Sequence, residues 1–341
     1  MHPDLLTFYC PLPQEVSEQH DDLRENTLTW VRKFDLADGD PQRTIMLAFT
    51  GAAYSAYATP HATGATAQAL SDYNAWAWAA NDVAGSDLAA GELIVHLGRW
   101  ERLMRSPGSF PQATDPMDVA LDDVFSRLRD LLTPVQWERF VAGQSQWLYS
   151  MGWEVGLREQ GGPATLNDYL AVRIGSVGCY SAVSYIDAVE GIELDEQQWA
   201  SRTVRAAAES AMLVAALDND RTSYNRERKL SVRKHNIFDV VRAEHPETSF
   251  ENAVSTAIGL RDRAMTLYLQ LRKRILDGAD DTMSRYVAGI DRIVSGNIDL
   301  ATAAVRYLDP ETSHLFRRVD VPQSTAVPLS VPTVSWWWKC V

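Results

Sequence analysis

Helix-breaking residues recur along this chain about one helix length apart, and the stretches between them carry the hydrophobic spacing of helices. Between residues 121 and 132 the apolar side chains stand three and four positions apart, as on one helix face. The alternating runs and tight Asn-Gly or Asp-Gly turns of β-hairpins are missing. We therefore predict a single all-α domain of roughly ten or more helices over residues 21–317. The breakers are Thr59-Pro60-His61, Ser106-Pro107-Gly108, Gly161-Gly162-Pro163 and Leu276-Asp277-Gly278.

The two ends of the sequence differ from this helical body. Residues 1–20 contain three prolines and predict an extended arm. Residues 318–341 contain three further prolines, too closely spaced for a helix interior, and then three consecutive tryptophans at 336–338. Two interpretations of this tail stay open: a flap over the body, or a loose end, which is the commoner state of termini.

The charge of the chain limits its partners. Its 32 Lys and Arg residues against 45 Asp and Glu residues give a net charge of −13. Nucleic acids and anionic membranes need a basic face, so we expect neither as a partner. We also see no signal peptide, no apolar run of about 18 residues that could span a membrane, and no cysteine pair typical of disulfide or zinc frameworks. We therefore expect a soluble, cytoplasmic protein.

The most informative motif lies in residues 211–230, an alanine-rich segment without glycine or proline. Asn219, Ser223 and Glu227 stand four residues apart in it, so they share one helix face over about 12 Å. An amide oxygen, a hydroxyl and a carboxylate together form a ligand set suited to Mg²⁺. The alternative interpretation is a solvated polar face stabilised by pairs of neighbouring side chains.

The full pattern, N-D-x-x-S-x-x-R-E from residue 219 to 227, resembles the second metal motif of the bacterial class I terpene synthase family. Residues 71–87 resemble the helix that carries the first motif of that family, and Asn81 and Asp82 fall in register with its acids. Asn81 stands where the family has its first Asp, and Gly85 stands where it has its last acid. Because carboxylate charge is lost, we expect weaker metal binding at this first motif.

Two further segments resemble the parts of this family that bind diphosphate. Arg173 precedes Val177 and Gly178 in a glycine-containing stretch, which resembles the family's diphosphate-sensing helix with its break. The pair Arg306 and Tyr307 resembles the terminal lid motif. The resemblance implies that these two arginines, Tyr307 and the motif residue Arg226 bind the diphosphate, since guanidinium groups match phosphate oxygens.

The resemblance covers most of the chain and implies a helical bundle around a central cavity. It implies an enzyme that ionises an allylic isoprenoid diphosphate, usually with three Mg²⁺ ions, and cyclises the carbocation before releasing the product. Aromatic faces would stabilise the cation. The candidate wall residues are Phe49, Tyr54, Trp76, Trp78, Val177, Gly178 and Tyr180.

The size of the substrate is a separate hypothesis. The helix before Asn81 is rich in alanine at positions 75, 77, 79 and 80, which favours a deep pocket and a C20 diphosphate over a C15 one. Alanine is also simply a good helix former, so a C15 (sesquiterpene) substrate stays open. No D-x-D-D string is present, so any pre-cyclised C20 substrate would come from a partner class II cyclase.

Three other interpretations compete with a terpene cyclase. A chain-elongating prenyltransferase needs two intact Asp-rich motifs, and this sequence has neither. A binding protein that kept the fold and lost catalysis is consistent with Asn81 and Gly85. A helical scaffold with an acidic, solvated surface would show no coupled binding of diphosphate and Mg²⁺. A homodimer is the default expectation for assembly.

Overall fold

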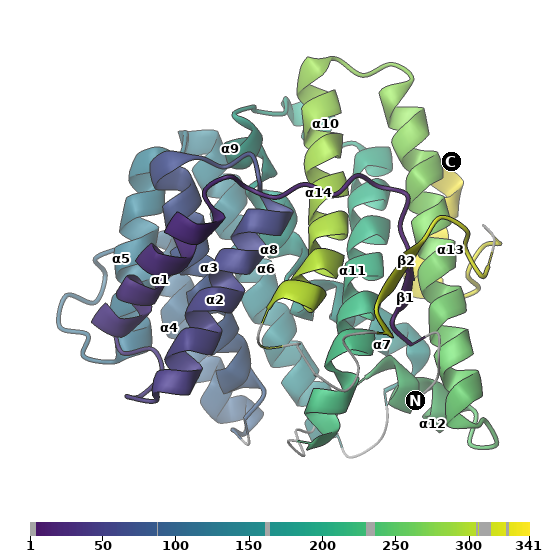
Figure 1. Cartoon of the computed structure of the whole chain (residues 1–341), viewed down its shortest axis with the longest axis horizontal. Coiled ribbons are helices and arrows are strands. Elements are labelled where there is room, and N and C mark those ends of the chain that lie inside the picture. The colour runs from purple at the N-terminus through teal and green to yellow at the C-terminus, as the bar shows by residue number, and fades with distance from the viewer. Residues whose placement is uncertain are drawn as a thin grey trace.

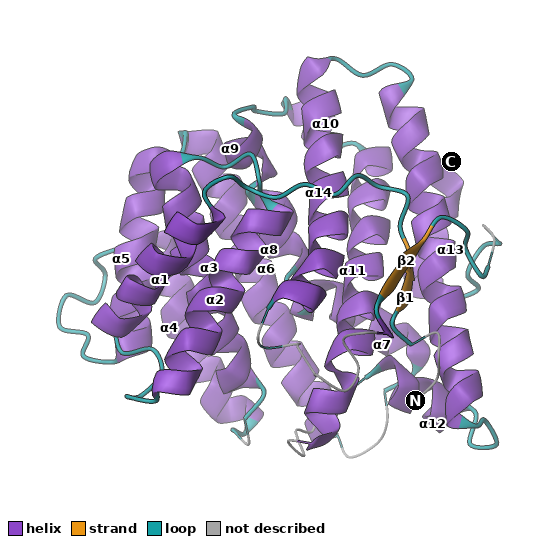
Figure 2. Cartoon of the chain, in the orientation of Figure 1, coloured by secondary structure: helices purple, strands orange, loops and turns teal. Residues whose placement is uncertain are grey.

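The computed structural model describes residues 5–86, 88–160, 164–229, 236–304, 306, 315–324 and 327–341, and of residues 225–229 it describes the backbone alone. Helices make up nearly all of the regular structure in these ranges (Figures 1 and 2), which confirms the all-α prediction. None of the helices in the described part is both long enough and apolar enough to cross a membrane.

Long helices form the body, and short ones connect them. The long helices are α1 (His20–Lys33), α2 (Pro41–Ala58), α3 (Gly64–Ala84), α4 (Ala90–Arg105), α5 (Pro116–Leu131), α6 (Pro134–Glu159), α11 (Arg202–Lys229), α13 (Phe250–Leu276) and α14 (Asp281–Ala303). The shorter ones are α7 (Leu166–Ser176), α8 (Cys179–Ser184), α9 (Ile186–Glu190), α10 (Glu196–Trp199), α12 (Ile237–Glu244), α15 (Pro332–Ser335) and the 3₁₀ helix η2 (Trp336–Cys340). Two short strands, β1 (Thr7–Tyr9) and β2 (Arg317–Val319), complete the fold.

Local sequence explains where these helices begin and end. Proline occupies the first helical position of α2, α5 and α6, where its missing N–H is not needed. The residue before it, such as Asp40 or Thr133, accepts hydrogen bonds from the free backbone N–H groups of the first turn. Three of the four predicted breakers separate or end helices as expected, and the fourth, at 161–163, lies outside the described residues.

Two glycines let α2 lie very close to its neighbours. A Cβ on Gly51 would meet the backbone of Ala75 in α3, and one on Gly296 of α14 would overlap the carbonyl group of Tyr57. Backbones can approach this closely only where a side chain is missing. The result is a tight α3–α2–α14 packing that fixes Tyr54, on α2, against α14.

The N-terminal arm is held in place on the body. β1 pairs in parallel with β2, and Figure 1 shows the arm crossing α14 on its way from β1 to α1. Arg221 of α11 donates to the backbone carbonyls of Leu5 and Thr7. Arg261 of α13 donates to Tyr9, and Asp218 of α11 accepts hydrogen bonds from both arginines. The arm is thus tied to a buried ionic network next to Asn219.

Asp72 of α3 is another buried charge, and it makes stability depend on pH. Its carboxylate lies 2.9 Å from Nη2 of Arg127, but burial raises the pKa of Asp72 from 3.8 to about 6, against the opposing effect of Arg127. Because the pKa is higher in the folded state, the protonated form favours folding below about pH 4, and this stability is lost as the pH rises through about 6. An Asp72→Asn variant should therefore gain roughly 3 kcal/mol of unfolding free energy relative to the wild type between about pH 4 and pH 7.

Urea unfolding of both proteins at the two pH values measures this difference. If the wild type instead becomes more stable than Asp72→Asn as the pH rises, the ion pair with Arg127 outweighs the cost of burying the charge.

Candidate active site

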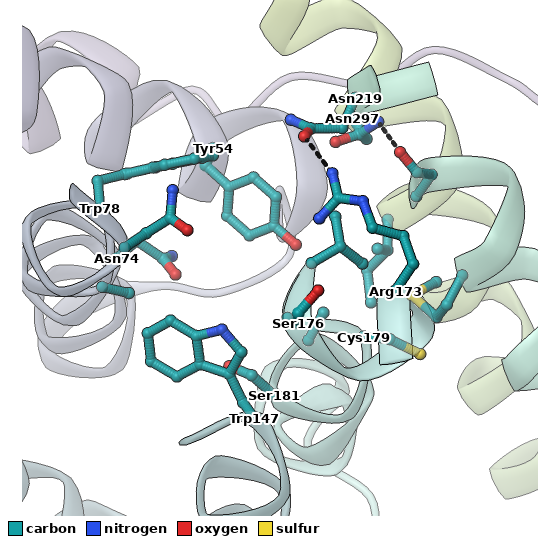
Figure 3. A pocket seen from close by; sticks show the side chains of 18 of the residues that line it. Tyr54, Asn74, Trp78, Trp147, Arg173, Ser176, Cys179, Ser181, Asn219 and Asn297 are labelled. Atoms are coloured by element: carbon teal, nitrogen blue, oxygen red, sulfur yellow. Dashed lines mark hydrogen bonds between the residues drawn. The ribbon is translucent and has the colours of Figure 1, made fainter. Parts of the chain in front are cut away.

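A cavity lies between the helices that carry the predicted motifs (Figure 3). It receives side chains from α2, α3, α6, α7, α8, α11 and α14 and from the turns around α8. Its lining residues are Tyr54, Asn74, Ala77, Trp78, Asn81, Trp147, Glu154, Arg173, Ser176, Val177, Gly178, Cys179, Ser181, Ala182, Tyr185, Met212, Ala215, Asn219, Asp220, Ile293 and Asn297. Residues predicted from four separate sequence segments therefore share one cavity.

Arg173 joins the predicted diphosphate segment to the predicted metal motif. Its Nη2 donates to Oδ1 of Asn219 at 2.8 Å, a contact drawn in Figure 3, and its Nε donates to Oδ1 of Asp220 at 2.9 Å. Two helices that are distant in the sequence, α7 and α11, thus bring a guanidinium group and an amide oxygen together at the cavity.

Asp220 fixes the position of this guanidinium group. It is almost fully buried, and its second carboxylate oxygen accepts hydrogen bonds from the hydroxyl of Tyr169 and from the backbone N–H of Ile237 at 3.1 Å. A carboxylate held by several donors is a rigid partner. Asp220 therefore orients Arg173, and the N–H of Ile237 and the hydroxyl of Tyr169 hold Asp220 in turn.

The break between α7 and α8 forms one wall of the cavity. Gly178, the residue before α8, has φ of +91°, a left-handed conformation that favours glycine. Gly175 packs directly against Ser150 of α6, where a Cβ would not fit. Ser176, between them, is buried and lines the cavity, and its Oγ has no hydrogen-bond partner within the described part of the chain.

The first motif lies at the end of α3. Asn81 lines the cavity, and its carbonyl accepts from the N–H of Gly85, which terminates the helix. Arg306 forms an ion pair with Asp82 at 2.6 Å, and its guanidinium carbon lies 5.1 Å from the centre of the Trp78 ring. The second predicted diphosphate-binding arginine is therefore also close to this cavity, paired with a candidate metal ligand.

The candidate oxygen ligands in the described part of the chain are of the kinds that a hard divalent cation binds. Ser223 lies one turn beyond Asn219 on α11, and it is buried with an Oγ that has no hydrogen-bond partner among the described residues. Buried hydroxyls are normally paired, so this oxygen is available to a ligand. The side chains of Arg226 and Glu227 and the whole of Tyr307 lie outside the described residues.

Carboxylates are scarce around these donors. Within the described ranges, no cluster of three or more His, Cys, Asp or Glu side chains could hold a metal by itself. Among the described lining residues, Glu154 and Asp220 carry carboxylates, and Asn74, Asn81, Asn219 and Asn297 carry amides.

Three expected wall residues do not line the cavity. Trp76 is fully buried in the core, where its indole N–H donates to the carbonyl of Met117 at 2.9 Å. Phe49 packs under the guanidinium of Arg24. Tyr180 points to the other side of α8 and lines a second hollow, between α7, α11 and the C-terminal segment. These three predictions were wrong because each side chain leaves its helix in a different direction from the cavity.

The alanines of α3 do not line the cavity as expected. Only Ala77 lines the cavity among the four alanines of α3 that suggested pocket depth. Ala75, Ala79 and Ala80 are fully buried against neighbouring helices. Their small size thus serves close helix packing and does not open the cavity.

Sequence reasoning missed several cavity residues from other helices. Trp147 and Glu154 come from α6, Tyr185 precedes α9, and Asn297 comes from α14. The pKa of Tyr185 is raised well above its usual value, mainly by burial and secondly by the neighbouring Tyr54, so this hydroxyl stays neutral. Asn297 directly follows Gly296, which contacts the backbone of Tyr57 in α2. This neighbouring glycine was the sequence feature that could have indicated its position at the cavity.

Comparison with known proteins decides the family. Residues 72–266, more than half of the chain, match terpene synthase family 2, C-terminal metal binding. The chain belongs to the bacterial class I terpene synthase family. It is an enzyme that cyclises isoprenoid diphosphates, as the resemblance of its motifs implied.

Relatives of this terpene synthase cover nearly its whole length. It is 38% identical over 98% of its own length and 97% of the other chain to diterpene cyclase DtcycB from a Streptomyces species. It is 26% identical to a (+)-T-muurolol synthase from Streptomyces clavuligerus, a farnesyl diphosphate cyclising enzyme, over 99% of its own length and 82% of the other. The solved SVS_A2 protein from ancestral sequence reconstruction superposes with a TM-score of 0.85 and 27% identity, covering 97% of this chain and 98% of that chain.

Proposed function

We propose that this terpene synthase ionises and cyclises a C20 allylic diphosphate with Mg²⁺. The observation that carries the proposal is the contact of Arg173 with Asn219 at the edge of an aromatic-lined cavity. It brings together a group suited to diphosphate and a group suited to the metal. The same cavity is also lined by apolar and aromatic side chains, which suit a hydrocarbon chain.

Both arginines that we assign to the diphosphate are paired with oxygens that we assign to the metal. Arg173 pairs with Asn219, and Arg306 pairs with Asp82. On diphosphate binding, the guanidinium N–H groups that now bond Asn219 and Asp82 would donate to phosphate oxygens instead, while Asp220 still holds Arg173. Asn219 and Asp82 would then be available as metal ligands. The pairs thus keep the polar groups satisfied while no substrate is bound.

The metal would be held by Asn219, Ser223 and Glu227, with Asn81 and Asp82 contributing from α3. Mg²⁺, when bound there, neutralises charge on the leaving diphosphate. Arg173 and Arg306 hold the diphosphate as the C–O bond breaks and its electron pair leaves with the oxygen, and Arg226 and Tyr307 are proposed to assist.

The walls then guide the carbocation. Tyr54, Trp78, Trp147 and Tyr185 present aromatic groups to the cavity, and ring faces attract cations. The cation would rearrange within these walls until the loss of a proton or the capture of water gives a neutral product. Val177 and Gly178 shape the wall at the α7–α8 break.

The similarity to known enzymes favours a C20 substrate. The chain is 38% identical to the relative named a diterpene cyclase but 26% identical to the farnesyl diphosphate cyclising relative. A pre-cyclised C20 diphosphate from a class II cyclase would also fit this assignment. No class II string is present in the chain, so such a substrate would need a separate enzyme.

The test is turnover of C10, C15 and C20 isoprenoid diphosphates with Mg²⁺, followed by product mass analysis. We expect C20 turnover that EDTA abolishes and Mg²⁺ restores, and a loss of roughly 10²-fold in Asn219→Leu. Exclusive use of the C15 substrate would remove the C20 assignment. An inactive wild type that gains activity in the double variant Asn81→Asp and Gly85→Glu would instead show a binding homologue impaired at its first metal motif.

A further inference from the structure

The C-terminal segment 327–341 packs against the two helices that carry Arg173 and Asn219. α15 lies on α7, where the backbone N–H of Thr333 donates to Oδ1 of Asn167 at 3.0 Å. η2 lies on α11, and this yellow end of the chain lies behind α13 in Figure 1. One terminal segment thus bridges both helices of the proposed site.

Trp337 anchors this segment in the body. Its side chain is fully buried, and its indole N–H donates to a carboxylate oxygen of Glu209 on α11 at 2.9 Å. The other oxygen of Glu209 accepts from Nε of Arg205 at 2.8 Å. A buried hydrogen bond to a charged acceptor is among the stronger contacts in proteins, so the anchor is specific as well as apolar.

The anchor lies directly behind the wall of the cavity. Glu209 and Tyr180, the residue after Cys179 on α8, line the same hollow between α7, α11 and the C-terminal segment. Cys179 lines the cavity and follows Gly178 at the α7–α8 break. The chain of neighbours therefore runs from Trp337 through Glu209 to the cavity wall.

We expect the backbone between α7 and α8 to depend on contacts with neighbouring segments for its position. Helical hydrogen bonding is interrupted there, and two glycines, Gly175 and Gly178, leave its backbone with more freedom than other residues would. Arg173 sits in the last turn of α7, immediately before the interruption. A small movement of the break would therefore move the guanidinium relative to Asn219 on α11.

We propose that the C-terminal segment is a positioning element of the active site and that Trp337 is its positioning residue. By holding α7 and α11 together, with Glu209 behind the break, it sets the distance between Arg173 and Asn219 and the contour of the wall at Cys179. This inference rests on the proposed function, because it assigns a geometric role toward the same site.

The experiment compares Trp337→Phe with the wild type in the full chain. Phenylalanine keeps an aromatic ring in the buried slot and removes the N–H that Glu209 accepts. We expect kcat/KM for the C20 diphosphate to fall by roughly 10-fold to 100-fold, with a higher KM and a changed ratio of cyclised products. The matched control is Trp199→Phe, an exposed indole on α10, which should leave KM and product ratio unchanged.

KM and product ratio separate positioning from mere stability. A destabilised protein loses folded molecules and hence apparent kcat, whereas its folded molecules keep KM and product ratio. Folded Trp337→Phe with both quantities at wild-type values overturns the proposal. If Trp337→Phe does not fold, Asn167→Ala decides, because it removes the contact of the segment with α7. A changed product ratio in Asn167→Ala supports the proposal, and an unchanged ratio overturns it.

Wild type and Arg173→Lys are assayed in the same series. If the wild type turns over the C20 diphosphate and Arg173→Lys does not, the proposed function is upheld, whatever the variants of the C-terminal segment do. An inactive wild type contradicts the proposed function itself.

Discussion

Replacing Arg173 with lysine is expected to lower kcat/KM by roughly 10²-fold to 10³-fold while the protein stays folded. Arg173 holds Asn219 and Asp220 through two different nitrogens, a fork that a single ammonium group cannot reproduce. Lysine keeps the charge, so a large loss would show that the planar geometry matters, as expected for contact with phosphate oxygens. Steady-state kinetics with the accepted diphosphate substrate measures the effect.

The matched control is Arg242→Lys on α12, an exposed arginine away from the cavity, which should leave the kinetics unchanged. Calorimetry with pyrophosphate and Mg²⁺ gives a second readout that needs no turnover, and we expect Arg173→Lys to bind the pair more weakly. Wild-type kinetics and wild-type pyrophosphate binding in Arg173→Lys would remove Arg173 from the diphosphate site.

The largest expected loss of stability is that of Asp218→Asn, at roughly 3–5 kcal/mol of unfolding free energy. Asp218 is buried and accepts two hydrogen bonds from Arg261, at 2.9 and 2.7 Å, and one from Arg221 at 3.3 Å. Burial already lowers the pKa of Arg221 to about 10, which shows how poorly this site solvates charge. Removing the carboxylate leaves two buried guanidinium groups without their shared partner.

Thermal or urea unfolding measures this effect, with a fall in melting temperature on the order of 10 °C. Asp130→Asn, an exposed aspartate on α5, is the control and should change stability by less than about 0.5 kcal/mol. Because these arginines also hold the N-terminal arm, faster proteolysis of residues 5–9 should accompany the loss. Unchanged unfolding of Asp218→Asn would mean that Asp262, 3.4 Å from Arg261, supplies the needed charge.

The sequence predicted which polar side chains share a helix face, because that is a matter of spacing along helices. Asn219 and Ser223 are one turn apart, and helical geometry alone places them on one face. Arg173 was found beside glycines that mark a break, and the structure has its helix break at Gly178. These features depend on residues within a few positions of each other.

The aromatic wall was predicted less well, because a periodic pattern does not say which helix face meets a cavity. Trp76 and Trp78 are two residues apart on α3, so their side chains point in directions about 160° apart around the helix axis. Trp78 lines the cavity, and Trp76 packs in the core against Trp100 and Trp147. Both faces of α3 are apolar, so the sequence pattern gave no reason to choose between them.

By itself, the sequence determined the helical class, the positions of three helix breaks, and the set of oxygens and guanidinium groups on each segment. Only the tertiary structure decided that Trp147 of α6 and Asn297 of α14 share one cavity with them, and that Trp337 is buried on Glu209 rather than loose. The physical reason is the range of the interactions. Helix spacing and capping are set within about four residues of chain, whereas a cavity wall and a docked terminus arise from packing between residues more than a hundred positions apart.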